Sequence, residues 1–471
     1  MVGQTCLMGT RCRIAALAVA AIGASLAGCT SAAGGQAGMA RPARPNAKAA
    51  VRPGDHADWP TYHANARRSG FLPGLPAAGR LAIGWSRRLD GAVYGQPLVI
   101  GNTVVAATER DTVYGLSLST GAVRWSARIG SPLPLSAQPC GDINPLGITS
   151  TPVYYRGLVY VVAQDGRARH LLAGISPATG KVRYRRFVPS PDGRPYFDQQ
   201  RAALAAENGR IYVAFGGHAG DCGPYVGSVV GVPAAGPGAG SERDVRYLVP
   251  SSHHAGIWAP GGPAIGQGGT IYVGVGNGDT SGKFDDSDSV TALSPALHRT
   301  GVFAPASWIA DNRSDLDLGS LTPVLIPGGH VLTVGKRGIG YLLSAGHLGG
   351  VGGQLSQHPV CTAFGSGAIA GQVLVVPCAG GGPARVAVVR NRIRVLWRGP
   401  GSADGSPVIG GGAVWVTANQ AGVLYELDPA TGKVRHKIAV RAGLPHFASP
   451  SLAGRLVLVG TLHGVVAVTG G

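Results

Sequence analysis

The stretch SPVIGGGAVWVTANQAGVLYELDPATGKVRHKIAV, from Ser406 to Val440, decides the fold. An apolar run is followed by a Gly-Gly turn and by the alternating run AVWVTA. A second turn, at Gln420 to Gly422, leads into VLYEL, and the tight turn DPATGK leads into VRHKIAV. Period-two alternation marks strands, and Gly, Asn and Asp-Pro mark the turns between them. Four short strands within about 40 residues are typical of one β-propeller blade.

The same pattern recurs along the chain and predicts an all-β, eight-bladed β-propeller. Eight second-strand cores of alternating apolar residues begin at Thr103, Val159, Ile211, Ile271, Val331, Val373, Val414 and Leu456. A single blade cannot bury both its faces, so such repeats form a core by closing into a ring. The last copy has only three strands, and a spare strand, LAIGWSRRL, begins at Leu81. We therefore expect this N-terminal strand to complete the last blade and remove an open sheet edge.

The first 28 residues have the features of a bacterial lipoprotein signal peptide. Arg11 and Arg13 precede an apolar run that is too short for a permanent membrane span. The run ends in Leu-Ala-Gly before Cys29, so we expect Cys29 to carry lipid as the first residue of the mature protein. An ordinary signal peptide with a chance cysteine is the alternative. We expect an exported protein that is lipid-anchored to the outer face of the cell membrane.

Composition divides the remainder into three segments. Residues 29–57 are mostly Ala, Gly, Pro and Arg, which suits a flexible tether. Residues 58–79 contain Trp59 and Tyr62, and we expect them to pack across the side or base of the propeller. Residues 80–471 then form the propeller as a single domain.

The net charge of +18 at pH 7 indicates a basic surface. Arg is scattered along the chain and no basic run is interleaved with aromatic residues, so we expect a solvated surface and no nucleic-acid partner. Contact with anionic headgroups or envelope polymers is the alternative. We expect a monomer that binds an envelope protein or a small ligand on the face formed by the loops.

Four cysteines remain outside the signal peptide and Cys29. An even number in an exported domain favours two disulfides, and four cysteines allow three pairings. Cys361 and Cys378 both belong to the sixth expected blade. Cys140 precedes the second blade and Cys222 follows the second strand of the third, on the same face. We therefore predict that Cys140 pairs with Cys222 and Cys361 with Cys378.

The repeats also share a turn motif: SLSTGAVRW at 117–125, ISPATGKVRY at 175–184 and LDPATGKVRH at 427–436. This motif resembles that of the PQQ-binding-like, or quinoprotein alcohol dehydrogenase-like, eight-bladed propellers. The resemblance covers about residues 80 to 471 and implies the fold. Propellers of this kind include dehydrogenases and also non-enzymatic scaffolds, among them the lipoprotein subunit of the outer-membrane β-barrel assembly machinery.

The resemblance also implies where a cofactor site would lie. IWAPGGPAIGQGGTIYVGVGNG resembles the family segment with the Trp beneath the quinone and an Asn ligand of its cation, which here are Trp258 and Asn277. In SDLDLGS, Asp315 matches the catalytic base and Asp317 the extra carboxylate of lanthanide-type enzymes. In GKRGIGYLL, Lys336 matches the residue that contacts the quinone. The implied cofactor is PQQ with calcium or a lanthanide.

The sequence departs from the family pattern at three places. PCGDINP contains only Cys140 where the family has a vicinal cysteine pair. GGHAGDCGPYVG has no Glu to act as a cation ligand, and Asp221 is the carboxylate that could replace it. Val226 stands where an arginine is expected. A site for a tricarboxylate cofactor would therefore lack several charge-assisted contacts.

Each of these residues also has a purely structural interpretation. Trp258 could fill the central channel, Asp315 and Asp317 could cap a turn, and Lys336 could be a solvated side chain at a strand end. We favour a lipid-anchored, non-enzymatic propeller that binds a ligand or protein at the cell envelope. A PQQ-dependent quinoprotein dehydrogenase of alcohols or sugars, with a remodelled site, is the alternative. In either case we expect Trp258, Asn277, Asp315 and Lys336 to converge at the channel mouth.

Overall fold

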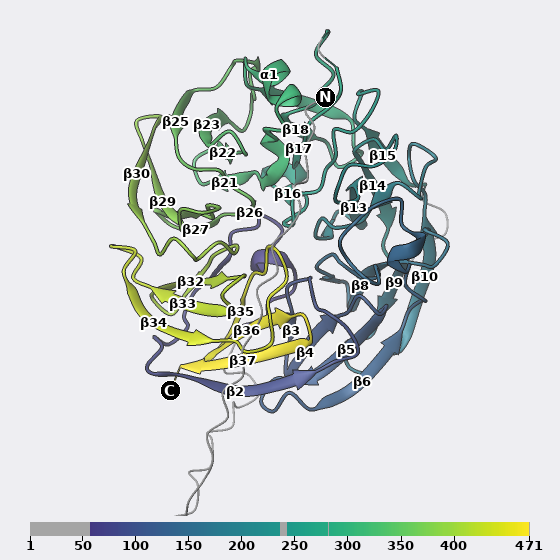
Figure 1. Ribbon diagram of the computed structural model, residues 1–471, viewed down its shortest axis with the longest axis vertical. Helices are drawn as coiled ribbons and strands as arrows, with labels where there is room; N and C mark the ends of the chain where they lie inside the picture. Colours follow the sequence, from purple (N-terminus) through teal and green to yellow (C-terminus); the bar gives the residue numbers. More distant parts are fainter. Residues whose placement is uncertain (1–56, 236–242, 281, 471) are drawn as a thin grey trace, which may run out of the picture. The chain divides into compact units, whose positions relative to one another are not determined.

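A computed structural model describes residues 57–235, 243–280 and 282–470. The expected signal peptide, the lipidation site Cys29 and the tether up to residue 56 lie outside the described residues. Eight antiparallel sheets follow one another along the described chain and surround a common centre (Figure 1). The predicted all-β, eight-bladed propeller is therefore confirmed.

The first four blades are numbered from the N-terminus, and their strands run from the innermost outwards. Blade 1 consists of β3 (Leu98–Ile100), β4 (Thr103–Ala107), β5 (Thr112–Ser117) and β6 (Val123–Arg128). Blade 2 consists of β7 (Val153–Tyr155), β8 (Leu158–Gln164), β9 (His170–Ile175) and β10 (Val182–Val188). Blade 3 consists of β12 (Ala205–Glu207), β13 (Arg210–Gly217), β14 (Ser228–Pro233) and β15 (Val245–Leu248), with β11 (Asp198–Gln199) also paired to β13. Blade 4 consists of β16 (Ala264–Ile265), β17 (Ile271–Val275), β18 (Ser289–Leu293) and β19 (Arg299–Ala304).

The other four blades follow in the same order. Blade 5 consists of β21 (Val324–Ile326), β22 (His330–Val334), β23 (Ile339–Ser344) and β25 (Ser356–Pro359). Blade 6 consists of β27 (Ala368–Ala370), β28 (Val373–Val376), β29 (Ala384–Val389) and β30 (Arg392–Arg398). Blade 7 consists of β31 (Val408–Gly410), β32 (Ala413–Ala418), β33 (Val423–Leu427) and β34 (Val434–Ala439). Blade 8 consists of β35 (Ser451–Ala453), β36 (Leu456–Thr461), β37 (Gly464–Gly470) and β2 (Leu81–Arg88).

Short elements connect or extend the blades. They are η1 (Tyr62–Ala64), β1 (Phe71–Leu72), η2 (Leu135–Ala137), η3 (Gln267–Gly269), α1 (Trp308–Arg313), η4 (Leu318–Ser320), β20 (Leu321–Thr322), β24 (Gly350–Val351) and β26 (Gly365–Ser366). No helix in the described part of the chain is long and apolar enough to cross a membrane.

The ring closes as the sequence predicts. β2 pairs antiparallel with β37, with Leu81 opposite Gly470 and Arg88 opposite Gly464 (Figure 1). The last blade thus takes three strands from the end of the chain and one from its beginning, so its sheet has no missing outer strand. Each predicted second-strand core lies in the second strand of its blade.

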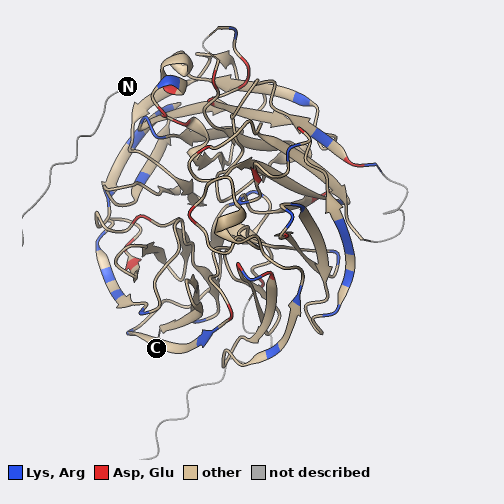
Figure 2. Ribbon diagram, turned by 45° about the vertical axis from the view of Figure 1, so that its right-hand side comes forward, with Lys and Arg blue, Asp and Glu red and all other residues tan. Residues whose placement is uncertain are grey.

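Basic residues gather on the outermost strands, where Figure 2 shows Lys and Arg along the rim of the ring. In β30, for example, Arg392, Arg394 and Arg398 are exposed and alternate with more buried positions. An outermost strand presents unpaired backbone groups, and alternating charge opposes pairing with another sheet. The outer strands account for part of the net charge without a concentrated patch.

The segment from Trp59 to Leu72, called here the plug segment, runs along the inner strands of the ring, so the expectation that it packs across the side or base of the propeller is wrong. Its backbone carbonyls accept hydrogen bonds from the innermost strands of four blades, and β1 pairs parallel with β31. These bonds are Tyr154 N to Pro60 O (2.7 Å), Ile265 N to Ala66 O (2.8 Å), Ile369 N to Ser69 O (2.7 Å) and Ile409 N to Gly70 O (2.7 Å). The edges that the blades present to the channel are therefore paired, which removes an exposed set of backbone donors.

Side chains of the plug segment fill the channel. Arg68 is 2% exposed and donates to the carbonyls of Pro263 (3.1 Å) and Leu204 (2.9 Å). His63 is fully buried, with Nδ1 3.1 Å from the Gly367 carbonyl and Nε2 3.0 Å from Ser449 Oγ. Burial lowers the pKa of His63 to about 3, so the imidazole is neutral. These bonds join blades that are far apart in sequence.

Both predicted disulfides are present. Cys140 pairs with Cys222, with their Cα atoms 6.0 Å apart, and Cys361 pairs with Cys378, with their Cα atoms 5.6 Å apart. Disulfides persist in oxidising compartments, so this pairing indicates an extracytoplasmic protein.

Candidate functional site

One position of the repeat lines a cavity in most blades. It lies four residues before the innermost strand, on the face that carries the loops before the first strands and after the second strands. We call this face the loop face. The residues at this position that line its hollows are Tyr94, Thr149, Arg201, Pro260, Phe364, Asp404 and Phe447. The ring therefore repeats a geometry while the chemistry at each blade differs.

A cavity of ≈ 320 Å³ opens on the loop face over blades 3 to 5. We call it the charged hollow. The five residues proposed from the sequence resemblance all line it: Trp258, Asn277, Asp315, Asp317 and Lys336. The expected convergence is therefore observed, while the catalytic, cofactor and metal roles of these residues stay predictions.

Lys336 is the centre of the polar contacts in the charged hollow. Its Nζ lies 2.5 Å from Asp315 Oδ1 and 2.6 Å from Asp317 Oδ2. Asn277 completes the group, because its backbone N–H donates to Asp317 Oδ1 (2.6 Å) and its Nδ2 donates to Asp315 Oδ1 (2.7 Å). Gly276 permits this approach, since a Cβ there would lie 2.5 Å from Asp317 Oδ1. One ammonium group thus bridges two carboxylates.

The electrostatics favour the charged form of the lysine. Burial alone would lower the pKa of Lys336, but Asp317 and Asp315 outweigh it, so the pKa lies above its usual value. Asp317 is buried, whereas the side chain of Asp315 is 71% exposed. The pair of Lys336 with Asp317 is therefore shielded from solvent, and the contact with Asp315 lies at its open side.

The geometry bears on the structural alternatives for three of these residues. Asp317 precedes η4, but its side chain makes no capping bond to that helix. The Lys336 side chain is only 19% exposed, so it is not a solvated strand-end lysine. Trp258 is half-buried and lines the hollow, while His63 and Arg68 of the plug segment fill the channel below.

Aromatic and cationic side chains surround Trp258. The Lys336 Nζ lies 5.9 Å and the Arg201 Cζ 5.7 Å from the indole ring centre. Phe364 lies 6.4 Å from Trp258, ring centre to ring centre, and 5.9 Å from Phe447 in a near-stacked arrangement. Sequence reasoning missed Arg201, Phe364 and Phe447. Their shared place, four residues before an innermost strand, is the signal that would have found them.

The donor set does not fit calcium or a lanthanide. A cation held by Asp315 and Asp317 would need the place that the Lys336 ammonium takes. Asp221, the expected substitute ligand, accepts a hydrogen bond from Tyr225 OH at 2.5 Å. In the described ranges, no three His, Cys, Asp or Glu side chains are grouped so that they could hold a metal ion. Hard cations require several oxygen ligands, which this group does not provide.

The hollow also does not fit a tricarboxylate such as PQQ. Four carboxylates line it, from Asp221, Asp279, Asp315 and Asp317, against the two cations Arg201 and Lys336. Val226, at the expected arginine, is buried and contributes only its backbone N–H, which donates to Asp192. An anionic ligand would meet an excess of negative charge.

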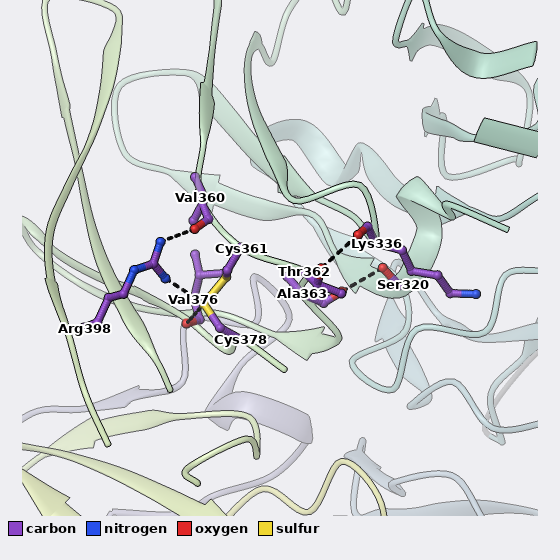
Figure 3. The surroundings of a disulfide bond; sticks show 9 residues. All are labelled: Ser320, Lys336, Val360, Cys361, Thr362, Ala363, Val376, Cys378 and Arg398. Atoms are coloured by element: carbon purple, nitrogen blue, oxygen red, sulfur yellow. Dashed lines mark hydrogen bonds between the residues drawn. A yellow bond between two sulfur atoms is a disulfide. The ribbon is translucent and has the colours of Figure 1, made fainter. Parts of the chain in front are cut away.

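Each disulfide lies beside this face of the ring. Cys222 follows Asp221 of the charged hollow. Figure 3 shows that the Cys361–Cys378 bridge holds the segment from which Thr362 Oγ1 donates to the Lys336 carbonyl at 3.0 Å. Arg398 donates to the Val360 carbonyl at the other end of that segment. The second bridge therefore supports the backbone that carries Lys336.

The comparisons agree with this fold. Residues 81–262 match the family model described as outer membrane protein assembly factor BamB. No curated protein matches the chain. Quinohemoprotein alcohol dehydrogenase from Comamonas testosteroni is 15% identical, with a TM-score of 0.61 over 87% of this chain and 80% of that one.

Two further solved structures show the same likeness. A europium-containing methanol dehydrogenase is 14% identical, with a TM-score of 0.63 over 87% of this chain and 97% of that one. BamB from Moraxella catarrhalis is 14% identical, with a TM-score of 0.55 over 82% of this chain and 99% of that one. The chain therefore has the PQQ-binding-like, eight-bladed propeller fold of the quinoprotein alcohol dehydrogenase type, and such low identities show the fold alone.

Proposed function

We propose that this protein is an exported, lipid-anchored propeller that binds a ligand or partner protein on its loop face and does not catalyse quinone-dependent oxidation. The observation that carries the proposal is the position of Lys336 Nζ, 2.5 Å from Asp315 and 2.6 Å from Asp317. Breaking such a pair would leave the carboxylate of Asp317 buried without its counter-charge. A metal ion would therefore have to displace a bound ammonium before it could hold a quinone.

A cofactor titration tests this proposal. Purified protein is mixed with PQQ and with calcium or lanthanum, and quenching of tryptophan fluorescence and reduction of a dye by alcohols are followed. We expect no saturable, metal-dependent quenching and no dye reduction. Metal-dependent PQQ binding together with dye reduction would establish the dehydrogenase and refute the proposal.

The anchor has its own test. Cys29 stands at the end of the apolar signal run. Two acyl chains on such a cysteine are enough to hold a protein stably on a membrane. We expect the wild-type protein in the membrane fraction and the Cys29→Ala variant released from it or mislocalised. An unchanged membrane fraction for Cys29→Ala would contradict lipid anchoring.

A further inference from the structure

A second and larger cavity, of ≈ 530 Å³, opens on the loop face over blades 6 to 8. We call it the apolar hollow. Its walls include the side chains of Phe364, Leu444, Phe447 and Leu462. Leu462 is 38% exposed, so its apolar side chain is partly open to water. A volume of this size is typical of small-molecule sites, which combine apolar walls with a few polar groups.

Phe447 has a strained backbone conformation at the hollow. Its φ is +61°, in the left-handed region that bulky residues rarely adopt. Its ring packs against Phe364 on one side, and Arg201 Cζ lies 4.6 Å from its centre. Conformations of this kind persist where the surroundings impose them, and they gather at ligand-binding positions. Phe447 lines the apolar hollow and Arg201 lines the charged hollow, so these two packed side chains form the wall between the hollows.

The polar end of the apolar hollow offers acceptors. Asp404 Oδ1 accepts a hydrogen bond from the backbone N–H of Asn419 at 2.8 Å. The side-chain Oδ1 of Asn419 has no hydrogen-bond partner among the described residues, but it is closed to solvent and so to a ligand. The carboxylate of Asp404, which lines the hollow, is therefore the acceptor that a ligand can reach.

We propose that the apolar hollow binds a small molecule with an aromatic or aliphatic body and a protonated amine. The body would contact Phe364, Phe447 and Leu462, and the amine would donate to the carboxylate of Asp404. An ammonium group suits this end because it has three donors and no acceptor. The proposal rests on the proposed function in one respect, namely that the loop face is the binding face.

Two probes that share a ring but differ in charge test the proposal. Isothermal titration of the full soluble chain with tryptamine should show saturable binding, and indole-3-propionate should bind at least about tenfold more weakly, because only the amine makes charge-assisted bonds. Asp404→Asn should weaken tryptamine binding by about tenfold and leave indole-3-propionate nearly unchanged.

A matched pair of variants controls for fold and surface effects. Leu462→Ser should weaken both probes by a similar factor, because it removes apolar contact and no charge. Leu396→Ser, at an exposed leucine of outer strand β30, should leave both affinities unchanged. Absence of tryptamine binding, equal affinity for the two probes, or equal loss with Leu396→Ser would each overturn the proposal. If the amine site fails in one of these ways and the protein also does not bind PQQ, the proposed function is not contradicted.

Discussion

The charged hollow and the apolar hollow occupy the same face of one ring but differ in how their carboxylates are paired. In the charged hollow, the Lys336 ammonium bridges Asp315 and Asp317, which Asn277 also contacts. In the apolar hollow, Asp404 accepts a hydrogen bond from the Asn419 backbone and forms no ion pair within the described residues. Side chains on one face of a ring can thus pair internally in one hollow and leave a carboxylate without a counter-charge in the other.

Both disulfides lie beside the loop face, and removing these bridges should give the largest effect. The chain-entropy model predicts a loss of about 4 kcal/mol for Cys140→Ser/Cys222→Ser, which opens an 82-residue loop, and about 3 kcal/mol for Cys361→Ser/Cys378→Ser, with a 17-residue loop. Urea unfolding measures both losses.

The two bridges can be told apart by where they hold the backbone. Hydrogen exchange should increase at residues 217–227 in the first double variant and at residues 360–364 in the second. Increased exchange at both segments in both variants would show that the bridges do not act locally.

Removing the ammonium of Lys336 should have the next largest effect. Lys336→Ala leaves Asp317 buried without a counter-charge, and we expect a loss of about 2 kcal/mol, less than for a fully buried pair because Asp315 is exposed. The variant should also gain a rise in melting temperature on addition of calcium that the wild type lacks. Arg337→Ala, which removes the partner of Asp311 outside the hollow, is the control and should show no calcium effect. A calcium effect in the wild type would break the contrast between the hollows.

The pH dependence of stability should reflect the buried carboxyls of blades 1 to 4. Burial raises the pKa of Glu109 to about 7 and of Asp111, Asp198 and Asp288 to about 8. Between about pH 4 and pH 8 these carboxyl groups are protonated in the folded state and ionised in the unfolded state. The folded state therefore binds more protons, and the free energy of unfolding falls as the pH rises towards 8. The buried histidines, with pKa values lowered to about 3 or 4, act in the opposite direction only below about pH 6.5.

The free energy of unfolding is therefore measured above about pH 6.5, where the buried histidines no longer contribute. Between pH 6.5 and 8, the free energy of unfolding should fall by about 1 kcal/mol per pH unit for each such group. Asp111→Asn should reduce this slope, because the amide keeps the shape without titrating. A slope that is unchanged in Asp111→Asn would show that this carboxyl does not bind its proton in the folded state.

The smallest effect concerns the wall between the hollows. Phe447→Gly removes the ring but suits a left-handed backbone, whereas Phe447→Ala removes the ring and keeps the strain. Ala should therefore be less stable than Gly by about 1 kcal/mol, measured by thermal unfolding. Equal stability of the two variants would indicate that the backbone at Phe447 is not strained.

Much of the fold could be predicted from the sequence because its signals are local or depend on order alone. Alternation and turn residues mark each strand, and three strands at the end with one spare strand near Leu81 predict the closure. The disulfides also follow from which face each cysteine occupies. The route of the plug segment could not be predicted, because its partners are backbone groups of distant strands that carry no sequence signature.

The charged hollow was predicted in part. The order of blades brings Trp258, Asn277, Asp315 and Lys336 to one mouth, so their convergence follows from motif position. The bridge from Lys336 to both Asp315 and Asp317 could not be seen, because it depends on side-chain reach across a loop. Arg201 and Phe447 were missed because they belong to no motif of the family and share only a position in the repeat.

The plug segment has a consequence for the order of events during synthesis. It is made before any blade, yet it pairs with β27 and β31 of late blades. Likewise, β2 pairs with β37, the last strand to be made. Pairing between residues so far apart is slow, because the chain loses its entropy before the contacts form. Hairpins can form locally as the chain emerges, and their inner strands can pair with the plug segment, which is already made. The edge of β2 stays open to proteases and to other nascent chains until β37 arrives. Pairing of β2 with β37 is therefore the step that closes the ring.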